Sequence, residues 1–216
     1  MPTKQDLLDS GARLTPTWVR RRFGFLFRPF PDHIFIHIPK TGGTSIEQAL
    51  HFSHEHKWAL EKRAEMGRLR WNRRFSFTIV RNPWDRLVSY YFHELTVSEA
   101  RLAQNPVPFS EWIRSILGEG GFSPYEEWKY SKYLANQWDW ITDRKGNVLV
   151  DFVARFERLQ SDFDHIGKSI GQPHAVLPHL KRSNHDPDYR VYYDEETRKL
   201  VESFYSDDIH QLCYNY

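Results

Sequence analysis

Blocks of apolar residues recur along the chain, and three of them share one form. Each is a short apolar run that stops abruptly before a stretch with a different periodicity. The runs cover residues 33–38, 75–81 and 148–156. Runs that are rich in β-branched and aromatic residues are typical of strands buried on both faces of a parallel sheet. The pattern therefore predicts three buried strands.

The stretches that follow these runs predict helices, because their apolar residues recur at helical spacing. Residues 39–51 predict a loop and then a helix, and residues 83–95 and 157–171 predict helices after the second and third runs. Residues 194–205 predict a further amphipathic helix. Strands that alternate with helices predict an α/β fold, here a P-loop-type parallel β-sheet flanked by helices.

Helix start and stop signals agree with these boundaries. Thr44 and Glu47 have the spacing of a capping box. Asn82 is followed by Pro83, an expected N-cap residue before proline at the first helical position. Gly171 is expected to end the helix after the third strand.

The alternation of strands and helices also predicts how the chain is organised. Residues 1–32 are rich in Arg and Pro and are expected to form an N-terminal arm. Residues 33–216 are expected to form a single domain, since 216 residues are few for two full cores. Within it, residues 96–147 break the alternation and predict a helical insertion on the acceptor side.

Composition excludes several classes of protein. Lys and Arg exceed Asp and Glu by only 30 to 28, so no broad field for binding nucleic acid is expected. The one cysteine, Cys213, permits no internal disulfide. No run of about 18 apolar residues and no signal-peptide core occur, so we expect no transmembrane segment and a cytoplasmic location.

The loop after the first strand, PKTGGTS at 39–45, has the chemistry of an anion site. Two glycines let the backbone approach a ligand, and the N–H groups at a helix start attract negative charge. Lysine adds a full charge, and hydroxyl groups add donors. The residues that we expect to bind are Lys40, Thr41, Gly42, Gly43, Thr44 and Ser45. Lysine precedes the glycines, unlike in the kinase-type loop. An ordinary tight turn with a capped helix is the alternative.

The junction after the second strand offers a second anion contact. Arg81 follows the strand at the carboxyl edge, where open α/β sheets bind ligands. An arginine there suits bidentate contact with phosphate, although by itself it could equally be a salt-bridge residue. Ser89 lies two turns into the following helix.

Taken together, IPKTGGTS and VRNPWDRLVSYY resemble the two nucleotide motifs of the PAPS-dependent sulfotransferase superfamily, most closely its carbohydrate sulfotransferase branch. Residues 150–160 and 177–185 resemble later family segments, so the likeness covers about 33–216. It implies that 3′-phosphoadenosine 5′-phosphosulfate (PAPS) is the donor and the 3′,5′-bisphosphate (PAP) the product. The first loop would hold the 5′-phosphosulfate, and Arg81 and Ser89 the 3′-phosphate.

Further roles follow from the same resemblance. Arg182 and Ser183 lie in the segment expected to close over the nucleotide. Lys40 would reach the oxygen that bridges sulfur and phosphorus and stabilise charge on the leaving phosphate, so no metal is required. His56, ahead of Trp58, is the expected base for an acceptor hydroxyl.

Other readings of the histidine-rich stretch 51–61 stay open. His51, His54 and His56 could be surface residues, and their spacing suits no common zinc pattern. Glu55 and Glu94 are alternative bases, although Glu94 is rather expected on the helix surface.

Three functions remain at this stage. The first is sulfuryl transfer from PAPS to a saccharide hydroxyl, with the saccharide resting on resemblance alone. The second is a small-molecule kinase that uses ATP and Mg²⁺. The third is a nucleotide-binding module without catalysis.

Overall fold

The computed structural model describes residues 33–97, 101–118, 132–178 and 185–216. These belong to one compact unit, Asp32–Tyr216. Arg182 and Ser183 lie outside the described residues. No described helix is long and apolar enough to cross a membrane.

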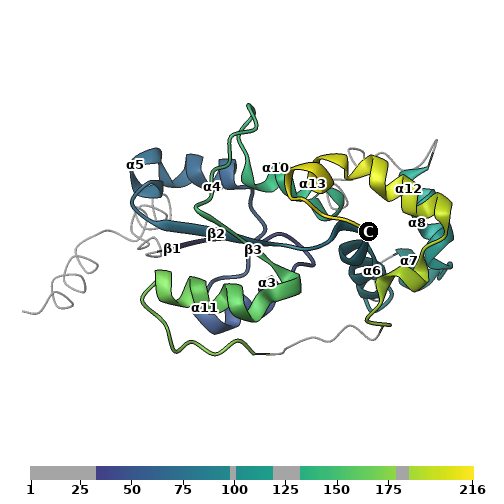
Figure 1. Ribbon diagram of the computed structural model, residues 1–216, viewed down its shortest axis with the longest axis horizontal. Helices are drawn as coiled ribbons and strands as arrows, with labels where there is room; N and C mark the ends of the chain where they lie inside the picture. The colour runs from purple at the N-terminus through teal and green to yellow at the C-terminus, as the bar shows by residue number, and fades with distance from the viewer. Residues whose placement is uncertain (1–32, 98–100, 119–131, 179–184) are drawn as a thin grey trace, which may run out of the picture. The chain divides into compact units, whose positions relative to one another are not determined.

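A parallel sheet forms the centre of the described chain (Figure 1). Its strands are β1 (His33–Ile36), β2 (Phe75–Val80) and β3 (Phe152–Arg155), in the order β1-β2-β3. Register pairs Phe35 with Phe77, and Ile79 with Ala154. The three predicted strands are therefore confirmed, and so is an α/β fold with a parallel sheet.

The third strand is shorter than the predicted 148–156. Val148 instead makes an isolated antiparallel bridge with Thr142. Asp151 turns its carboxylate onto the edge of β2, where Oδ2 accepts from the Ser76 N–H at 2.8 Å and from its hydroxyl at 2.7 Å. Regular pairing with β2 begins at Phe152, although the Asp151 N–H already donates to the Ser76 carbonyl at 2.9 Å.

Helices cover both faces of the sheet. On one face lie α3 (Gly43–Leu50) and α11 (Leu159–Ser169), preceded by η1 (Phe156–Arg158). On the other lie α4 (Ala59–Met66), α5 (Arg68–Trp71) and α10 (Gln137–Ile141) (Figure 1). The first face has a continuous core: Phe35, Ile46, Leu50, Phe77, Ile79, Ala154, Phe163, Ile166 and Leu177. Burial of these side chains fixes which way each strand faces.

A second core lies beyond the strand ends, around α6 (Pro83–Glu94) (Figure 1). The helical spacing of apolar residues in 83–95 predicts a buried stripe of Leu87, Val88, Tyr91, Phe92 and Leu95. The first three are buried, whereas Phe92 and Leu95 are partly buried against this core. The elements that complete this part of the molecule are α7 (Arg101–Gln104), α8 (Phe109–Leu117), η2 (Tyr189–Tyr192), α12 (Glu195–Phe204) and α13 (Ser206–Gln211). The partition into arm, domain and insertion stays a prediction.

Helix starts differ from the sequence prediction at one place. α6 has the expected cap, since Asn82 Oδ1 accepts from the Trp84 N–H at 3.0 Å. α3 has Gly42 as N-cap and no side-chain cap bond. The predicted capping box of Thr44 and Glu47 is thus wrong, because the helix begins at Gly43 and Glu47 turns to histidine partners instead.

Candidate functional site

The loop between β1 and α3 bends sharply through left-handed backbone. Lys40 has φ 68° and Gly42 has φ 85°. A non-glycine residue in this region costs about 1–2 kcal/mol. Such strain is kept where surrounding structure enforces it, and it clusters at functional sites. The strain at Lys40 therefore marks this loop as a candidate site.

Gly43 is the position at which the loop packs most tightly. A Cβ there would fall 2.1 Å from Cδ2 and 2.3 Å from Nε2 of His37. The His37 ring is 5 % exposed, so it has little room to withdraw. Only glycine fits at this position, which is itself buried.

The start of α3 is suited to an anion. It has no side-chain cap and no acidic residue in its first turn. Its first N–H groups thus keep their partial positive charge. Thr44 is exposed and Ser45 half-buried, whereas the buried Thr41 hydroxyl donates to the Ile38 carbonyl at 2.9 Å. The Thr41 hydroxyl hydrogen is therefore already used within the loop.

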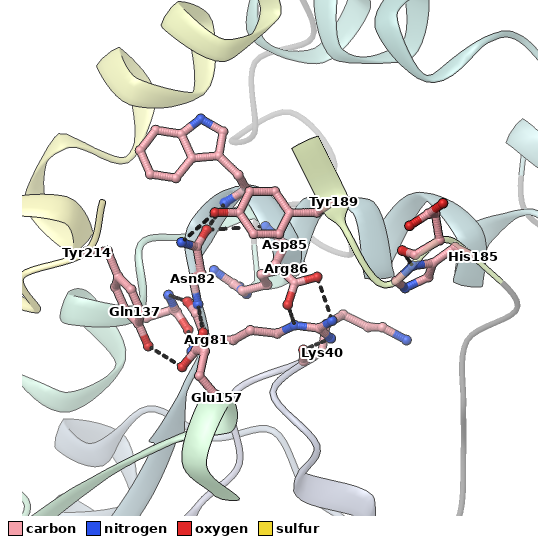
Figure 2. A network of polar contacts seen from close by, with 12 residues as sticks. Lys40, Arg81, Asn82, Asp85, Arg86, Gln137, Glu157, His185, Tyr189 and Tyr214 are labelled. Atoms are coloured by element: carbon pink, nitrogen blue, oxygen red, sulfur yellow. Dashed lines mark hydrogen bonds and ion pairs between the residues drawn. The ribbon is translucent and has the colours of Figure 1, made fainter. Parts of the chain in front are cut away.

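The second junction lies against the first. The Arg81 guanidinium pairs with Asp85 through bonds of 2.7 and 2.8 Å, and Nη1 donates to the Lys40 carbonyl at 3.3 Å. It also lies over the Phe156 ring, with Cζ 4.1 Å from the centroid. Figure 2 shows the guanidinium between the Asp85 carboxylate and the Lys40 backbone. The structure thus brings together the two segments that the sequence singled out.

Arg86 ties the loop to the segment before α10. This side chain is 2 % exposed. Nε donates to the Pro39 carbonyl at 3.2 Å, while Nη1 and Nη2 donate to the carbonyls of Ala135 at 2.9 Å and Tyr133 at 2.8 Å. Ser89, one turn further along α6, is buried at 5 % exposure. Arg86 therefore fixes the position of the loop, a role that sequence reasoning missed.

Gln137 completes the end of β2. Its Oε1 accepts from the Arg81 N–H at 2.8 Å, and its Nε2 donates to the Arg81 carbonyl at 2.8 Å (Figure 2). The same Nε2 donates to Asp208 at 3.0 Å. Burial raises the pKa of Asp208, although hydrogen bonds from Gln137 and Trp138 oppose the rise. The side-chain amide of Gln137 thus pairs with the N–H and C=O of Arg81 as the backbone of a neighbouring strand would.

His56 lies at the carboxyl end of β1. Its Nδ1 is 2.9 Å from the carbonyl oxygen of His37. A carbonyl only accepts, so Nδ1 carries the hydrogen and Nε2 keeps the lone pair. Burial lowers the pKa of His56 to about 4, against the opposing effect of the His37 bond. The ring is therefore neutral at pH 7.

The alternative bases are placed differently. Glu55 is bonded to Lys62 and lies 3.5 Å from Lys57. Burial would raise the pKa of Glu55, but the hydrogen bonds and charges of Lys62 and Lys57 together outweigh it, and the pKa is lowered. Glu94 is 8 % exposed, so its expected place on the helix surface is wrong.

The hydrogen-bond network of His37, Glu47 and His54 beside the loop was not predicted. His37 Nδ1 is 2.6 Å from Glu47 Oε1, and His54 Nδ1 is 2.8 Å from Glu47 Oε2. Burial would raise the pKa of Glu47, but bonds from both rings outweigh it and keep the pKa low. A histidine inside the apolar run 33–38 was the available signal for His37.

Comparison with known proteins gives one match. The sequence profile of the sulfotransferase family matches residues 24–216. Searches of curated proteins and of solved structures gave no match. The matched region contains the loop after β1 and the Arg81 junction.

Proposed function

The chain belongs to the sulfotransferase family, and on that basis we propose that it transfers a sulfuryl group from PAPS to a saccharide hydroxyl. The observation that carries this proposal is the contact between two cationic segments. Arg81 reaches the Lys40 carbonyl at 3.3 Å, beside a helix start without a side-chain cap. One nucleotide with phosphate groups at both ends of its ribose would suit such a pair.

The residues present fit the donor. The start of α3 at Gly43, which has no side-chain cap, suits the 5′-phosphosulfate. Arg81 and Ser89 suit the 3′-phosphate, with Arg81 exchanging part of its pairing with Asp85 for the ligand. Thr41, Gly42, Thr44 and Ser45 complete the loop that we assign to this ligand. PAPS supplies an activated sulfuryl group and a phosphate that can leave, and the loop has the P-loop role of holding it.

Lys40 is the residue that we assign to the leaving phosphate. Its ammonium would stabilise the negative charge that develops when the sulfur–oxygen bond breaks. The left-handed backbone of Lys40 sets where its side chain leaves the loop. We expect no divalent metal to be needed, because lysine and the helix start provide the positive charge.

His56 is the residue that we assign to the acceptor. Its Nε2 would take the proton from the attacking hydroxyl, while the Nδ1–H stays on the His37 carbonyl. Low basicity in the unliganded protein would be offset by the anionic donor, which favours the imidazolium form. Lys132 donates to the His56 carbonyl at 3.1 Å and so holds the backbone beside this ring.

A saccharide acceptor is supported by family resemblance and by one aromatic ring next to the base. The half-buried Tyr133 lies 5.8 Å from His56 between ring centroids, whereas Trp140, at 6.4 Å, is fully buried and stacked on Trp58. Aromatic faces suit the apolar faces of sugar rings.

Calorimetry with PAP, AMP and ATP tests the nucleotide assignment. We expect PAP to bind at least about tenfold more tightly than AMP, since only PAP fills the Arg81 contact. Equal affinity for AMP and PAP, or clear preference for ATP with Mg²⁺, would contradict the proposal.

A further inference from the structure

Three imidazole rings gather beside the loop and form what we call the histidine cluster: His37, His54 and His56. One ring nitrogen of each lies within 4.8 Å of the others. The ring centroids are 4.4, 4.8 and 5.4 Å apart. Sequence spacing grouped His51 with His54 and His56, whereas the folded chain replaces His51 with His37 from the end of β1.

In each ring of the histidine cluster, Nδ1 lies within hydrogen-bond distance of an oxygen atom. His37 and His54 share the two oxygens of Glu47, at 2.6 and 2.8 Å. His56 Nδ1 is 2.9 Å from the His37 carbonyl. Because carboxylates and carbonyls accept hydrogen bonds, each neutral ring carries its hydrogen on Nδ1. All three lone pairs are then on Nε2, and no group in the described parts of the chain bonds to those atoms.

This arrangement is the one found around histidine-bound metals. A ligating histidine donates its second ring N–H to a carboxylate or backbone carbonyl, which fixes the tautomer and raises basicity. The buried Glu47 side chain provides two such bonds, and the His37 carbonyl provides the third.

The separations also suit one shared ion. Three imidazoles around tetrahedral zinc, with Zn–N about 2.1 Å, place their nitrogens about 3.4 Å apart and their ring centres about 5 Å apart. The observed centroids already bracket that value. His54, with its side chain 65 % exposed, has room to rotate and close the remaining gap.

We propose that the histidine cluster binds a divalent transition-metal ion of the zinc class through the Nε2 atoms of His37, His54 and His56. Imidazole nitrogen suits Zn²⁺, Co²⁺, Ni²⁺ and Cu²⁺, whereas Mg²⁺ and Ca²⁺ prefer oxygen. Three protein ligands leave a fourth position for water.

Metal binding has a consequence for catalysis that rests on the proposed function. The lone pair of His56 that would accept the acceptor's proton is the one that the ion would occupy. A bound ion therefore inhibits sulfuryl transfer, and its removal restores it. The site would be regulatory, with catalysis itself free of metal.

Binding of Co²⁺ to the full, tag-free chain tests the proposal without reference to activity. We expect one Co²⁺ per chain with visible ligand-field absorption, displaced by Zn²⁺ and not by Mg²⁺. His54→Ala should weaken binding at least tenfold. His51→Ala is the matched control, an exposed histidine three residues away, and should bind like the unaltered chain.

Glu47→Gln gives a second variant that keeps the side-chain shape. Loss of an outer-shell carboxylate costs about 10- to 100-fold in metal affinity. No saturable Co²⁺ binding by the unaltered chain would overturn the proposal. Equal affinities for the unaltered chain and His54→Ala, or equal losses in His54→Ala and His51→Ala, would overturn it as well.

Turnover with added Zn²⁺ tests the inhibitory consequence separately. The unaltered enzyme should lose activity with the same metal dependence as binding, and His54→Ala should need at least tenfold more Zn²⁺ for the same loss. Saturable binding without inhibition would keep the metal site and remove His56 as the base. Inhibition that is identical in the two proteins would place the inhibiting ion elsewhere and overturn the regulatory role.

Discussion

The ends of β1 and β2 look alike in sequence, each an apolar run that meets a proline before a helix, yet they are built in opposite ways. After β2 the helix start is closed by the Asn82 cap, and Asp85 adds a negative charge in the first turn. After β1 the helix start has neither a side-chain cap nor an acid. A satisfied helix start has little to offer an anion, whereas an open one attracts it. The difference indicates that α3 contributes its backbone to a ligand, and the β2 junction contributes the Arg81 side chain.

The largest effect should come from His56, which lies on the β1 side. His56→Ala is expected to lower kcat by about 10²–10⁴-fold with little change in PAP affinity, because a base acts only in the chemical step. Steady-state kinetics in the presence of chelator, combined with calorimetry, would measure both. His51→Ala is the control and should stay near unaltered turnover. Full turnover of His56→Ala alongside loss in a Glu55 variant would show that the base was wrongly assigned.

Arg81→Ala tests the junction after β2. It removes a charge-assisted contact, so PAP affinity should fall by about 2–3 kcal/mol, or about 30- to 150-fold. AMP, which lacks the 3′-phosphate, should bind the variant and the unaltered protein alike. If the variant weakened AMP and PAP equally, Arg81 would hold the loop rather than the phosphate.

Gly43→Ala tests the tight packing under the open helix start. The added Cβ would fall 2.1 Å from the His37 ring. Overpacking of this kind costs about 1–3 kcal/mol of unfolding free energy. Urea unfolding should show a smaller loss when the same change is made in a His37→Ala background. An equal loss in both backgrounds would mean that the ring is not the obstacle.

The two helix starts can be compared directly through Asn82→Ala and Thr44→Ala. Loss of the Asn82 cap should cost about 1–2 kcal/mol of unfolding free energy. Thr44→Ala should change it by less than about 0.5 kcal/mol, since Thr44 is exposed and caps nothing. Urea denaturation measures both, and a larger loss from Thr44→Ala would reverse the assignment of the caps.

Chelation should have the smallest effect. Activity measured in excess chelator should be unchanged or slightly higher, because the positive charge at the site comes from lysine, arginine and backbone. A complete loss that Mg²⁺ restores would favour the kinase function instead.

The sequence predicted elements well and side-chain partners poorly. Apolar runs that end at proline or polar residues located the strands, since burial on both faces leaves a plain pattern. Glu47 shows the limit: its spacing from Thr44 is the same whether it caps a helix or reaches across to His37. Only the path of the chain through 51–56 decides between them, and that path depends on contacts distant in sequence.

The site residues also differ in whether the sequence predicts them. Lys40, the two glycines and Arg81 could be found because loops and strand ends have local signatures. The pairing of His56 with the His37 carbonyl could not, since the residues are 19 apart and share no periodic pattern. The assignments of ligand-binding roles to these residues stay predictions.

The two hydrogen bonds between the Gln137 side chain and the Arg81 backbone have a consequence for local unfolding. The Arg81 amide lies beyond β2, where an ordinary strand end would fray and exchange its hydrogen quickly. Here that hydrogen is bonded to a fully buried side chain, which is in turn anchored to Asp208 on α13. Exchange at Arg81 then requires release of the C-terminal helix as well, so the nucleotide side of the sheet and residues more than a hundred positions later should unfold as one cooperative unit.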